Sequence, residues 1–135
     1  MTDLTPNLPE IVAELRELFE RYEIALAEKD VAVLDASFWD SSHTIRYAIH
    51  EQAYGFNAIH AQRVARPPGT GIKERRIRLE ILTLGRNFGT VNLEFKMRGS
   101  DVVGRQSQTW VRFPEVGWKV VLAHVSTLLT KHPGT

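Results

Sequence analysis

Apolar residues recur at helical spacing near the start of the chain. One series, at intervals of four, three, four and three residues, consists of Ile11, Leu15, Leu18, Tyr22 and Ala25. This spacing is typical of the buried face of an amphipathic helix, which we expect to run to about Glu28. Asn7 and Glu10 resemble a helix-capping pair, and the prolines at 6 and 9 also fit a helix start here, so residues 1–7 are expected to form a loose tail.

Two shorter helices and a pair of short strands are indicated next. Asp30 is predicted to cap a short helix that extends through Phe38. The residues that this helix would turn inward are Val33, Leu34 and Phe38. Residues 44–48 and 52–54 are expected to be partner strands, and residues 56–65 a third helix.

The second half of the chain alternates between apolar and polar residues, which predicts half-buried strands. The apolar positions are Ile77, Leu79 and Ile81 in one strand and Val91, Leu93, Phe95 and Met97 in the next. Arg76 and Arg78 have the opposite parity in the first of these strands. We therefore expect both guanidinium groups to face solvent.

Residues 104–127 show the pattern of a β-hairpin, with two β-branched and aromatic runs on either side of a short Pro/Gly turn. One parity of the second run consists of Trp118, Val120, Leu122, His124 and Ser126. In a strand these side chains share one face, which begins apolar and ends polar. A polar end indicates that this face lines a hollow rather than a closed core.

The predicted order is two helices, two short strands, a third helix and four long strands. Helices followed by an antiparallel meander favour an α+β domain in which one curved sheet wraps around the N-terminal helices and leaves an internal pocket. Residues 1–135 are expected to form one such domain, since the length is ordinary for a single core.

Composition narrows the range of functions. The net charge is only +1, which argues against nucleic-acid binding, and the longest apolar runs are too short to cross a membrane. The absence of cysteine and of a secretory leader pattern fits a cytoplasmic location. Basic residues gather in 63–86, either as a solvated face or as a rim that attracts small anions.

No motif for metal or cofactor chemistry is evident. The five histidines lack ligand spacing, so we expect no metal site, and there is no Gly-rich phosphate loop. No serine nucleophile elbow is present either. We therefore expect no cofactor.

The order of elements and several short motifs together resemble the nuclear-transport-factor-2-like superfamily, the cone-shaped α+β fold of ketosteroid isomerases and SnoaL-type cyclases. The motifs are Glu28-Lys29-Asp30-Val31, Leu34…Phe38-Trp39-Asp40, Tyr54-Gly55 before Ile59, and Gly117-Trp118-Lys119-Val120-Val121…His124-Val125-Ser126. The resemblance covers almost the whole chain and implies a homodimer or larger homo-oligomer. It says little about activity, because this fold hosts many functions.

A closer resemblance is to the AtzH-like proteins of bacterial cyanuric acid catabolism. It is carried by Thr44-Ile45-Arg46-Tyr47, by Gly55…Ile59…Arg63…Arg66-Pro67 and by Arg105-Gln106-Ser107-Gln108-Thr109-Trp110. It implies a metal-independent amidohydrolase that removes one N-carboxyl group from 1,3-dicarboxyurea and leaves allophanate, in functional association with an amidase of that pathway. The alternative is a non-catalytic binding or accessory subunit of an amidase complex.

Tyr22 and Arg46 are the candidate catalytic residues. The isomerases of this fold place a hydrogen-bonding tyrosine at the position of Tyr22 and an aspartate base at that of Arg46. An arginine stays protonated, so the resemblance implies an anion-binding pocket rather than isomerase chemistry. The alternatives from the sequence are a core tyrosine and an outward-facing arginine.

Six further residues are candidates for substrate binding, and each also has a structural interpretation. They are Trp39, Tyr54, Arg63, Ser107, Trp110 and His124. The aromatic residues also suit a core, and Arg63 with His60 also suits a helix surface. His124 also suits a polar residue at the edge of a core.

Overall fold

The computed structural model describes residues 3–67 and 75–128 and confirms the α+β class. Its helices are α1 (Pro9–Glu28), α2 (Val31–Ser37) and α3 (Phe56–Ala65). Its strands are β1 (Ile45–Tyr47), β2 (Gln52–Tyr54), β3 (Arg76–Leu84), β4 (Phe88–Lys96), β5 (Val103–Phe113) and β6 (Gly117–Thr127). The predicted order of elements is therefore correct.

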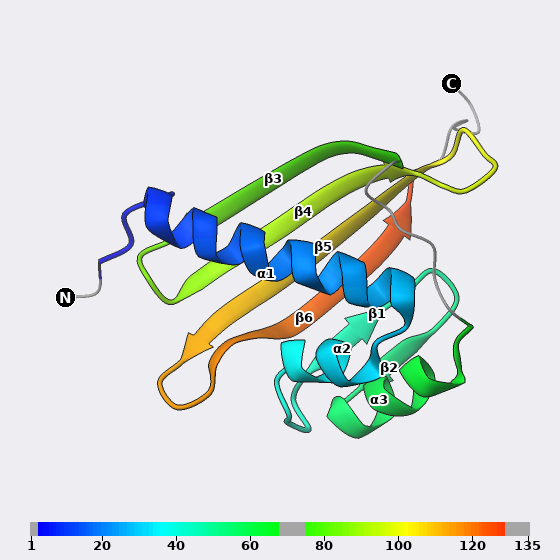
Figure 1. The fold of residues 1–135 in the computed structure, drawn as a ribbon, viewed down its shortest axis with the longest axis horizontal. Helices are drawn as coiled ribbons and strands as arrows, with labels where there is room; N and C mark the ends of the chain where they lie inside the picture. The colour runs from blue at the N-terminus through cyan, green and yellow to red at the C-terminus, as the bar shows by residue number, and fades with distance from the viewer. Residues whose placement is uncertain (1–2, 68–74, 129–135) are drawn as a thin grey trace, which may run out of the picture.

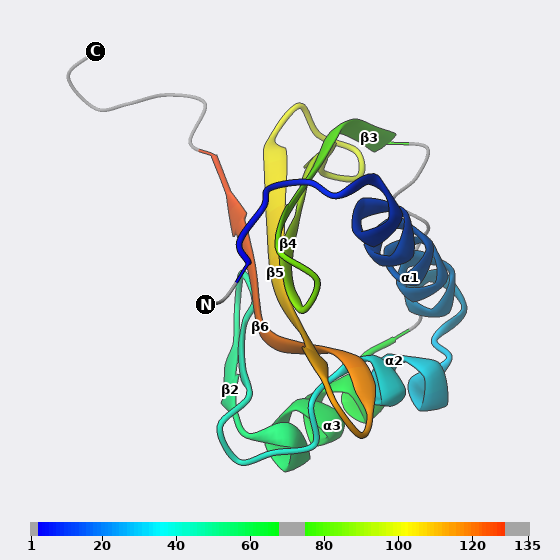
Figure 2. The ribbon, with the colours of Figure 1, turned by 90° about the vertical axis from the view of Figure 1, so that its left-hand side faces the viewer.

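The six strands form one curved, unclosed sheet in the order β2-β1-β6-β5-β4-β3. Helix α1 runs across one face of the sheet, which we call the inner face, while α2 and α3 lie at its β1–β2 end (Figure 1). Among the described elements no helix covers the opposite, outer face (Figure 2). Strand β1 is parallel to β6, whereas the other pairs are antiparallel.

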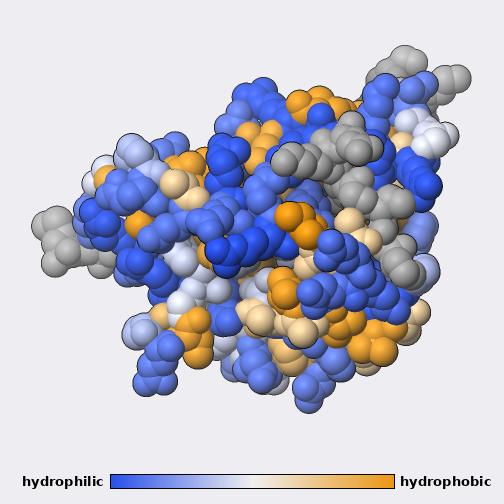
Figure 3. Space-filling model, in the orientation of Figure 1, coloured by the Kyte–Doolittle hydropathy of each residue, from blue (hydrophilic) through white to orange (hydrophobic). Residues whose placement is uncertain are grey.

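The core lies between α1, α2 and the inner face. Its largest fully buried side chains include Leu15, Phe19, Leu34, Phe38, Ile59, Val91, Trp110 and Val120. On the side of α1 that faces away from the sheet, the surface is mainly hydrophilic, and apolar residues gather toward α2 and α3 (Figure 3). This distribution is that of an amphipathic helix packed on a sheet.

The start of α1 differs from the prediction. Leu8 is the N-cap residue and makes no side-chain capping bond, so Asn7 and Glu10 are not a capping pair. Asn7 instead has a left-handed backbone (φ 55°), and its Oδ1 accepts a hydrogen bond from Thr83 N at 3.0 Å. The N-terminal segment is thereby tied to β3, and residues 5–7 are not a loose tail.

The short helix α2 follows its prediction more closely. The Asp30 carboxylate accepts a hydrogen bond from Val33 N at 3.2 Å, which confirms the expected N-cap. Leu34 and Phe38 are buried, but Val33 is 38% exposed and does not face inward. In a helix of seven residues, only one narrow stripe reaches the core.

A β-bulge reverses the expected parity at the start of β3. The pairing register shifts between Arg76 and Arg78, so that Ile77 is 51% exposed while Arg76 turns toward α1. Arg76 donates to Glu20 Oε1 at 2.7 Å. The prediction that Arg76 faces solvent is therefore wrong, whereas Arg78 is exposed as expected. A bulge inserts one residue, and every side chain on one side of it changes face.

Beside Arg76, α1 carries a buried acid. Glu23 is 4% exposed, and its carboxyl oxygens have no hydrogen-bond partner within the described part of the chain. Arg76 Nη2 lies 3.6 Å away from Glu23 Oε1. Burial raises the pKa of Glu23 from 4.5 to about 7, and the Arg76 charge only partly offsets this effect.

A second bulge reverses parity within β6. Trp110 pairs with Val120 but its neighbour Thr109 pairs with Leu122, which leaves one residue of β6 unmatched. Val120 is fully buried, whereas Leu122 and His124 face outward. The prediction that these side chains share one face with Trp118 is wrong for this reason.

Candidate functional site

A pocket of about 400 Å³ lies between α1 and the inner face, near the β1–β2 end of the sheet. It is lined by Tyr22, Leu26, Arg46, Ala48, Ile49, His50, Glu51, Arg66, Phe95, Gln106, Ala123 and Val125. A smaller hollow of about 50 Å³ adjoins it and shares Tyr22, Leu26, Arg46 and Arg66 with it. The sheet therefore encloses a hollow, as the sequence predicts, but Ala123 and Val125 of β6 line it rather than His124.

Tyr22 contributes a phenol to the pocket wall from the buried stripe of α1. Its ring packs beside Phe19 and Phe38, with centroids 6.3 and 6.2 Å away. Burial raises the pKa of Tyr22, although the charges of Arg63, Arg46 and Arg66 oppose that rise. The phenol is therefore neutral near pH 7, and no hydrogen bond from it occurs within residues 3–67 and 75–128. It is available to donate one hydrogen bond to a ligand.

Arg46 reaches the same pocket from β1, where it pairs with Ala53 on one side and with Ala123 on the other. These small neighbours leave room for its side chain, which is 8% exposed. Its Nη1 donates to Glu51 Oε1 at 3.1 Å and to Gln62 Oε1 at 3.4 Å. The expected juxtaposition of Tyr22 and Arg46 is thus present, and their catalytic roles stay a prediction.

Arg66, at the C-terminal end of α3, is a site residue that the sequence analysis missed. Its Nη2 lies 3.5 Å from the same Glu51 Oε1 that Arg46 contacts. Its Nε is buried without a hydrogen-bond partner within the described residues. Desolvation, followed by the charge of Arg46, lowers the pKa of Arg66. The clue in the sequence is its position directly before Pro67, because a following proline disfavours the helical backbone and ends α3 at Arg66, whose backbone is extended.

Arg63 lines the smaller hollow and is neutralised from α2. Its Nη1 donates to Asp35 Oδ1 at 2.6 Å, and its guanidinium lies 4.7 Å from the centroid of Phe38. His60 Nδ1 contacts the other oxygen of Asp35 at 2.6 Å. Arg63 is 5% exposed, so the alternative of a solvated surface face does not hold for it. These contacts fix α3 to α2 and support one wall of the site.

The structure does not bring the other predicted residues to this pocket. Trp110 is buried in the core and donates to Gln108 Oε1 at 3.1 Å. Trp39 stacks on Phe113 at a centroid distance of 4.9 Å. Tyr54 is 62% exposed, and its hydroxyl lies 3.1 Å from that of Tyr47. Trp110 is thus a core residue, Trp39 packs on another ring, and Tyr54 lies at the surface.

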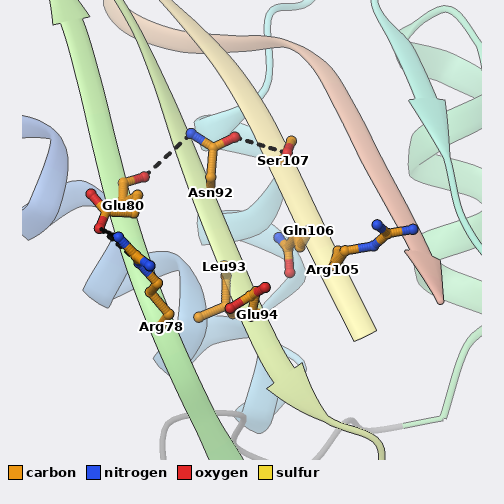
Figure 4. A pocket seen from close by; sticks show the side chains of 8 residues that line it. All are labelled: Arg78, Glu80, Asn92, Leu93, Glu94, Arg105, Gln106 and Ser107. Atoms are coloured by element: carbon orange, nitrogen blue, oxygen red, sulfur yellow. Dashed lines mark hydrogen bonds and ion pairs between the residues drawn. The ribbon is translucent and has the colours of Figure 1, made fainter. Parts of the chain in front are cut away.

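Ser107 lies on the outer face, at a hollow of about 330 Å³ between β3, β4 and β5 (Figure 4). Its hydroxyl donates to Asn92 Oδ1 at 2.8 Å. His124 is paired with Ser107 across β5 and β6 and is exposed on the same face. Because residues one apart in a strand face opposite sides, Gln106 lines the inner pocket and Ser107 cannot.

Within residues 3–67 and 75–128, no cluster of three or more His, Cys, Asp or Glu side chains has the arrangement of a metal site. Nor does the described chain contain a helix long and apolar enough to span a membrane. The polar residues that line the pocket in this part of the chain are Tyr22, Arg46, Arg66, Glu51, His50 and Gln106.

A curved α+β sheet wrapped around its first helix, with a pocket between them, is the nuclear-transport-factor-2-like fold. A superfamily protein of this fold from Salmonella enterica superimposes with a TM-score of 0.67 at 18% identity, covering 93% of this chain and 96% of the other. The chain belongs to the AtzH-like family, whose model matches residues 5–131.

Two more similar solved structures support this assignment. A protein of unknown function from Pectobacterium atrosepticum is 41% identical, with a TM-score of 0.83 and coverage of 92% of this chain and 95% of that one. A cystatin-like fold protein from Burkholderia xenovorans is 39% identical, with a TM-score of 0.87 and coverage of 95% and 99%. Comparison with curated proteins gave no match.

Proposed function

We propose that this protein is a small-molecule hydrolase of cyanuric acid catabolism that converts 1,3-dicarboxyurea to allophanate. Membership of the AtzH-like family supports a role linked to that pathway. The observation that carries the proposal is that the phenol of Tyr22, which makes no hydrogen bond within the described residues, and the buried guanidinium of Arg46 line one pocket. Such a pair suits a small anionic substrate that develops further charge on an oxygen.

Binding is assigned to Arg46. A guanidinium matches a carboxylate in a two-point fork, and the low exposure of Arg46 strengthens that contact. Tyr22 then donates to the urea oxygen. The pocket volume of about 400 Å³ easily accommodates a urea with two carboxylates.

The reaction breaks the bond between a urea nitrogen and the carbon of its attached carboxylate. The bonding electron pair stays on nitrogen and is delocalised onto the urea oxygen, which a donor such as Tyr22 stabilises. One proton is then delivered to that nitrogen. The dicarboxylate and one proton yield allophanate and carbon dioxide, or with water in place of the proton, allophanate and bicarbonate.

The decisive experiment is to incubate the purified protein with 1,3-dicarboxyurea and to compare allophanate formation with the spontaneous rate. Arg46→Ala is expected to lose about 2–5 kcal/mol of substrate recognition, because a desolvated charge pair is truncated. Arg86→Gln is a matched control, because Arg86 forms an exposed ion pair with Glu10 and does not line the pocket. Treatment with EDTA is expected to leave the rate unchanged. Absence of any acceleration by the wild-type protein would favour a non-catalytic accessory subunit.

We also propose that the protein acts as a homo-oligomer, with the outer face as the contact. A row of mutually paired residues, Ile45, Leu122, Thr109, Thr90 and Leu82, crosses this face. Leu122 and Leu82 are 38% and 46% exposed, and Tyr54 adds an exposed ring. Sedimentation of the wild type beside Leu122→Lys would test this contact, since a lysine there should favour the monomer. A functional association with an amidase of the same pathway and a cytoplasmic location complete the proposal.

A further inference from the structure

The carboxylate of Glu51 is shared between two guanidinium groups. Its Oε1 lies 3.1 Å from Arg46 Nη1 and 3.5 Å from Arg66 Nη2. One negative charge therefore faces two positive ones, and the pocket wall carries an excess of positive charge. Arg63 adds little to this excess, because Asp35 neutralises it at 2.6 Å.

The hydrogen-bonding capacity of Arg66 is not fully used. Its Nε is buried and has no partner within the described residues. A buried donor that loses water without gaining a partner costs free energy, which a ligand oxygen would recover. The side chain lines both the main pocket and the adjoining hollow, so a ligand in either space reaches it.

We propose that Arg66 binds a second carboxylate of the substrate and that Glu51 occupies this carboxylate position while the pocket is empty. The inference rests on the proposed function and extends it: the site selects small dianions with a carboxylate at each end. Arg46 holds one end and Arg66 the other. Glu51 acts as an internal competitor that the dianion displaces.

The exposures of the three side chains fit this exchange. Glu51 is 35% exposed, so its carboxylate is already partly hydrated and can rotate away from the guanidinium groups into water. Arg46 is only 8% exposed, so its guanidinium belongs to the buried pocket wall. When Glu51 leaves, the two arginines keep their charges and need two negative charges in return. A monoanion leaves one guanidinium unpaired, whereas a dianion satisfies both.

Glutarate is a suitable probe, because it is stable and has a carboxylate at each end of a chain as long as that of 1,3-dicarboxyurea. Valerate has the same chain length but only one carboxylate. Calorimetric titration of the wild type is expected to show glutarate binding at least about tenfold more tightly than valerate. Equal affinity for the two acids would overturn the proposal.

Two variants separate the roles of the residues. Arg66→Gln is expected to weaken glutarate binding by about tenfold or more and to change valerate binding by less than about twofold. Glu51→Gln is expected to tighten the binding of both acids, because the competing charge is removed. Arg86→Gln, at an exposed ion pair with Glu10, is the matched control and should bind both acids as the wild type does.

Circular dichroism would establish that each variant is folded, and Arg66→Lys provides a second test because it keeps the charge but loses the fork. Arg66→Lys is expected to retain a preference for glutarate that is smaller than that of the wild type. An equal loss of both acids in Arg66→Gln, or unchanged binding in Glu51→Gln, would overturn the proposal.

Failure of the proposed reaction is a separate outcome. If the wild type does not hydrolyse 1,3-dicarboxyurea but Arg66→Gln still loses its preference for glutarate, only the reaction is wrong and the dianion site is supported. If hydrolysis occurs while Arg66→Gln keeps the full preference for glutarate, the reaction is supported and the role of Arg66 is overturned.

Discussion

Glu23→Gln should change the way in which stability depends on pH. The wild-type carboxyl has a pKa of about 7 in the folded protein and 4.5 as its ordinary value. Between these two pH values the folded state keeps a proton that the unfolded chain has released. The contribution of Glu23 to the free energy of unfolding therefore falls as pH rises through this window and levels off above pH 7.

The size of the effect follows from the pKa. Each unit by which the pKa of a group rises on folding changes its contribution to the free energy of unfolding by about 1.36 kcal/mol. The rise from 4.5 to about 7 therefore corresponds to about 3 kcal/mol. A glutamine cannot release a proton, and it keeps nearly the same shape. The variant should therefore gain about 3 kcal/mol relative to the wild type between pH 4.5 and pH 8, whatever constant offset the loss of the Arg76 contact introduces.

Urea unfolding at pH 4.5, 5.5, 6.5 and 8 measures this difference. Other titrating groups, such as Asp3 and Glu10, are common to both proteins and cancel when the variant is compared with the wild type. Glu17→Gln is the control, since Glu17 lies on the same helix with its side chain 67% exposed. A difference between Glu23→Gln and the wild type that stays constant across this range would refute the burial argument.

Three further predictions concern the site and its supports. Tyr22→Phe should lower turnover of 1,3-dicarboxyurea by about 10²–10³ while the far-ultraviolet spectrum is retained, and undiminished turnover would exclude its role as donor. Gly104→Ala should lower the free energy of unfolding by about 1–3 kcal/mol, because the added Cβ would lie 2.4 Å from the Phe95 ring; an unchanged thermal midpoint would mean that the ring moves aside without cost. Asp35→Asn should cost about 3 kcal/mol in urea unfolding, since Arg63 loses the negative charge that neutralises it; full stability would show that this pair is not needed.

The helices and the long strands could be predicted because each has a long periodic pattern. The interval between Ile11 and Ala25 defines the buried stripe of α1, and it correctly includes Tyr22. The strand from Val91 to Phe95 keeps strict alternation, and these residues are buried as expected. In such segments burial alone decides the orientation of each side chain.

The errors come from features that are not periodic. A single inserted residue in β3 turned Arg76 inward, and another in β6 turned His124 outward. No local propensity in the sequence marks either position, because a bulge depends on the pairing with a neighbouring strand. The interaction between Glu51 and Arg66 was missed for a similar reason, as it joins the loop after β1 to the end of α3.

Within the described residues, every guanidinium group at the pocket wall, together with Glu51, belongs to one contiguous stretch, residues 46–66. The phenol comes from α1, and most of the apolar wall comes from α1 and the long strands. The arginines and Glu51, which would contact an anionic ligand, are thus encoded in a different part of the sequence from most of the scaffold that shapes the pocket. Grafting this stretch from a relative with a different charge pattern would exchange ligand preference while leaving the scaffold sequence intact. Substitutions confined to residues 46–66 would in the same way change the ligand preference of a natural relative while its scaffold is retained.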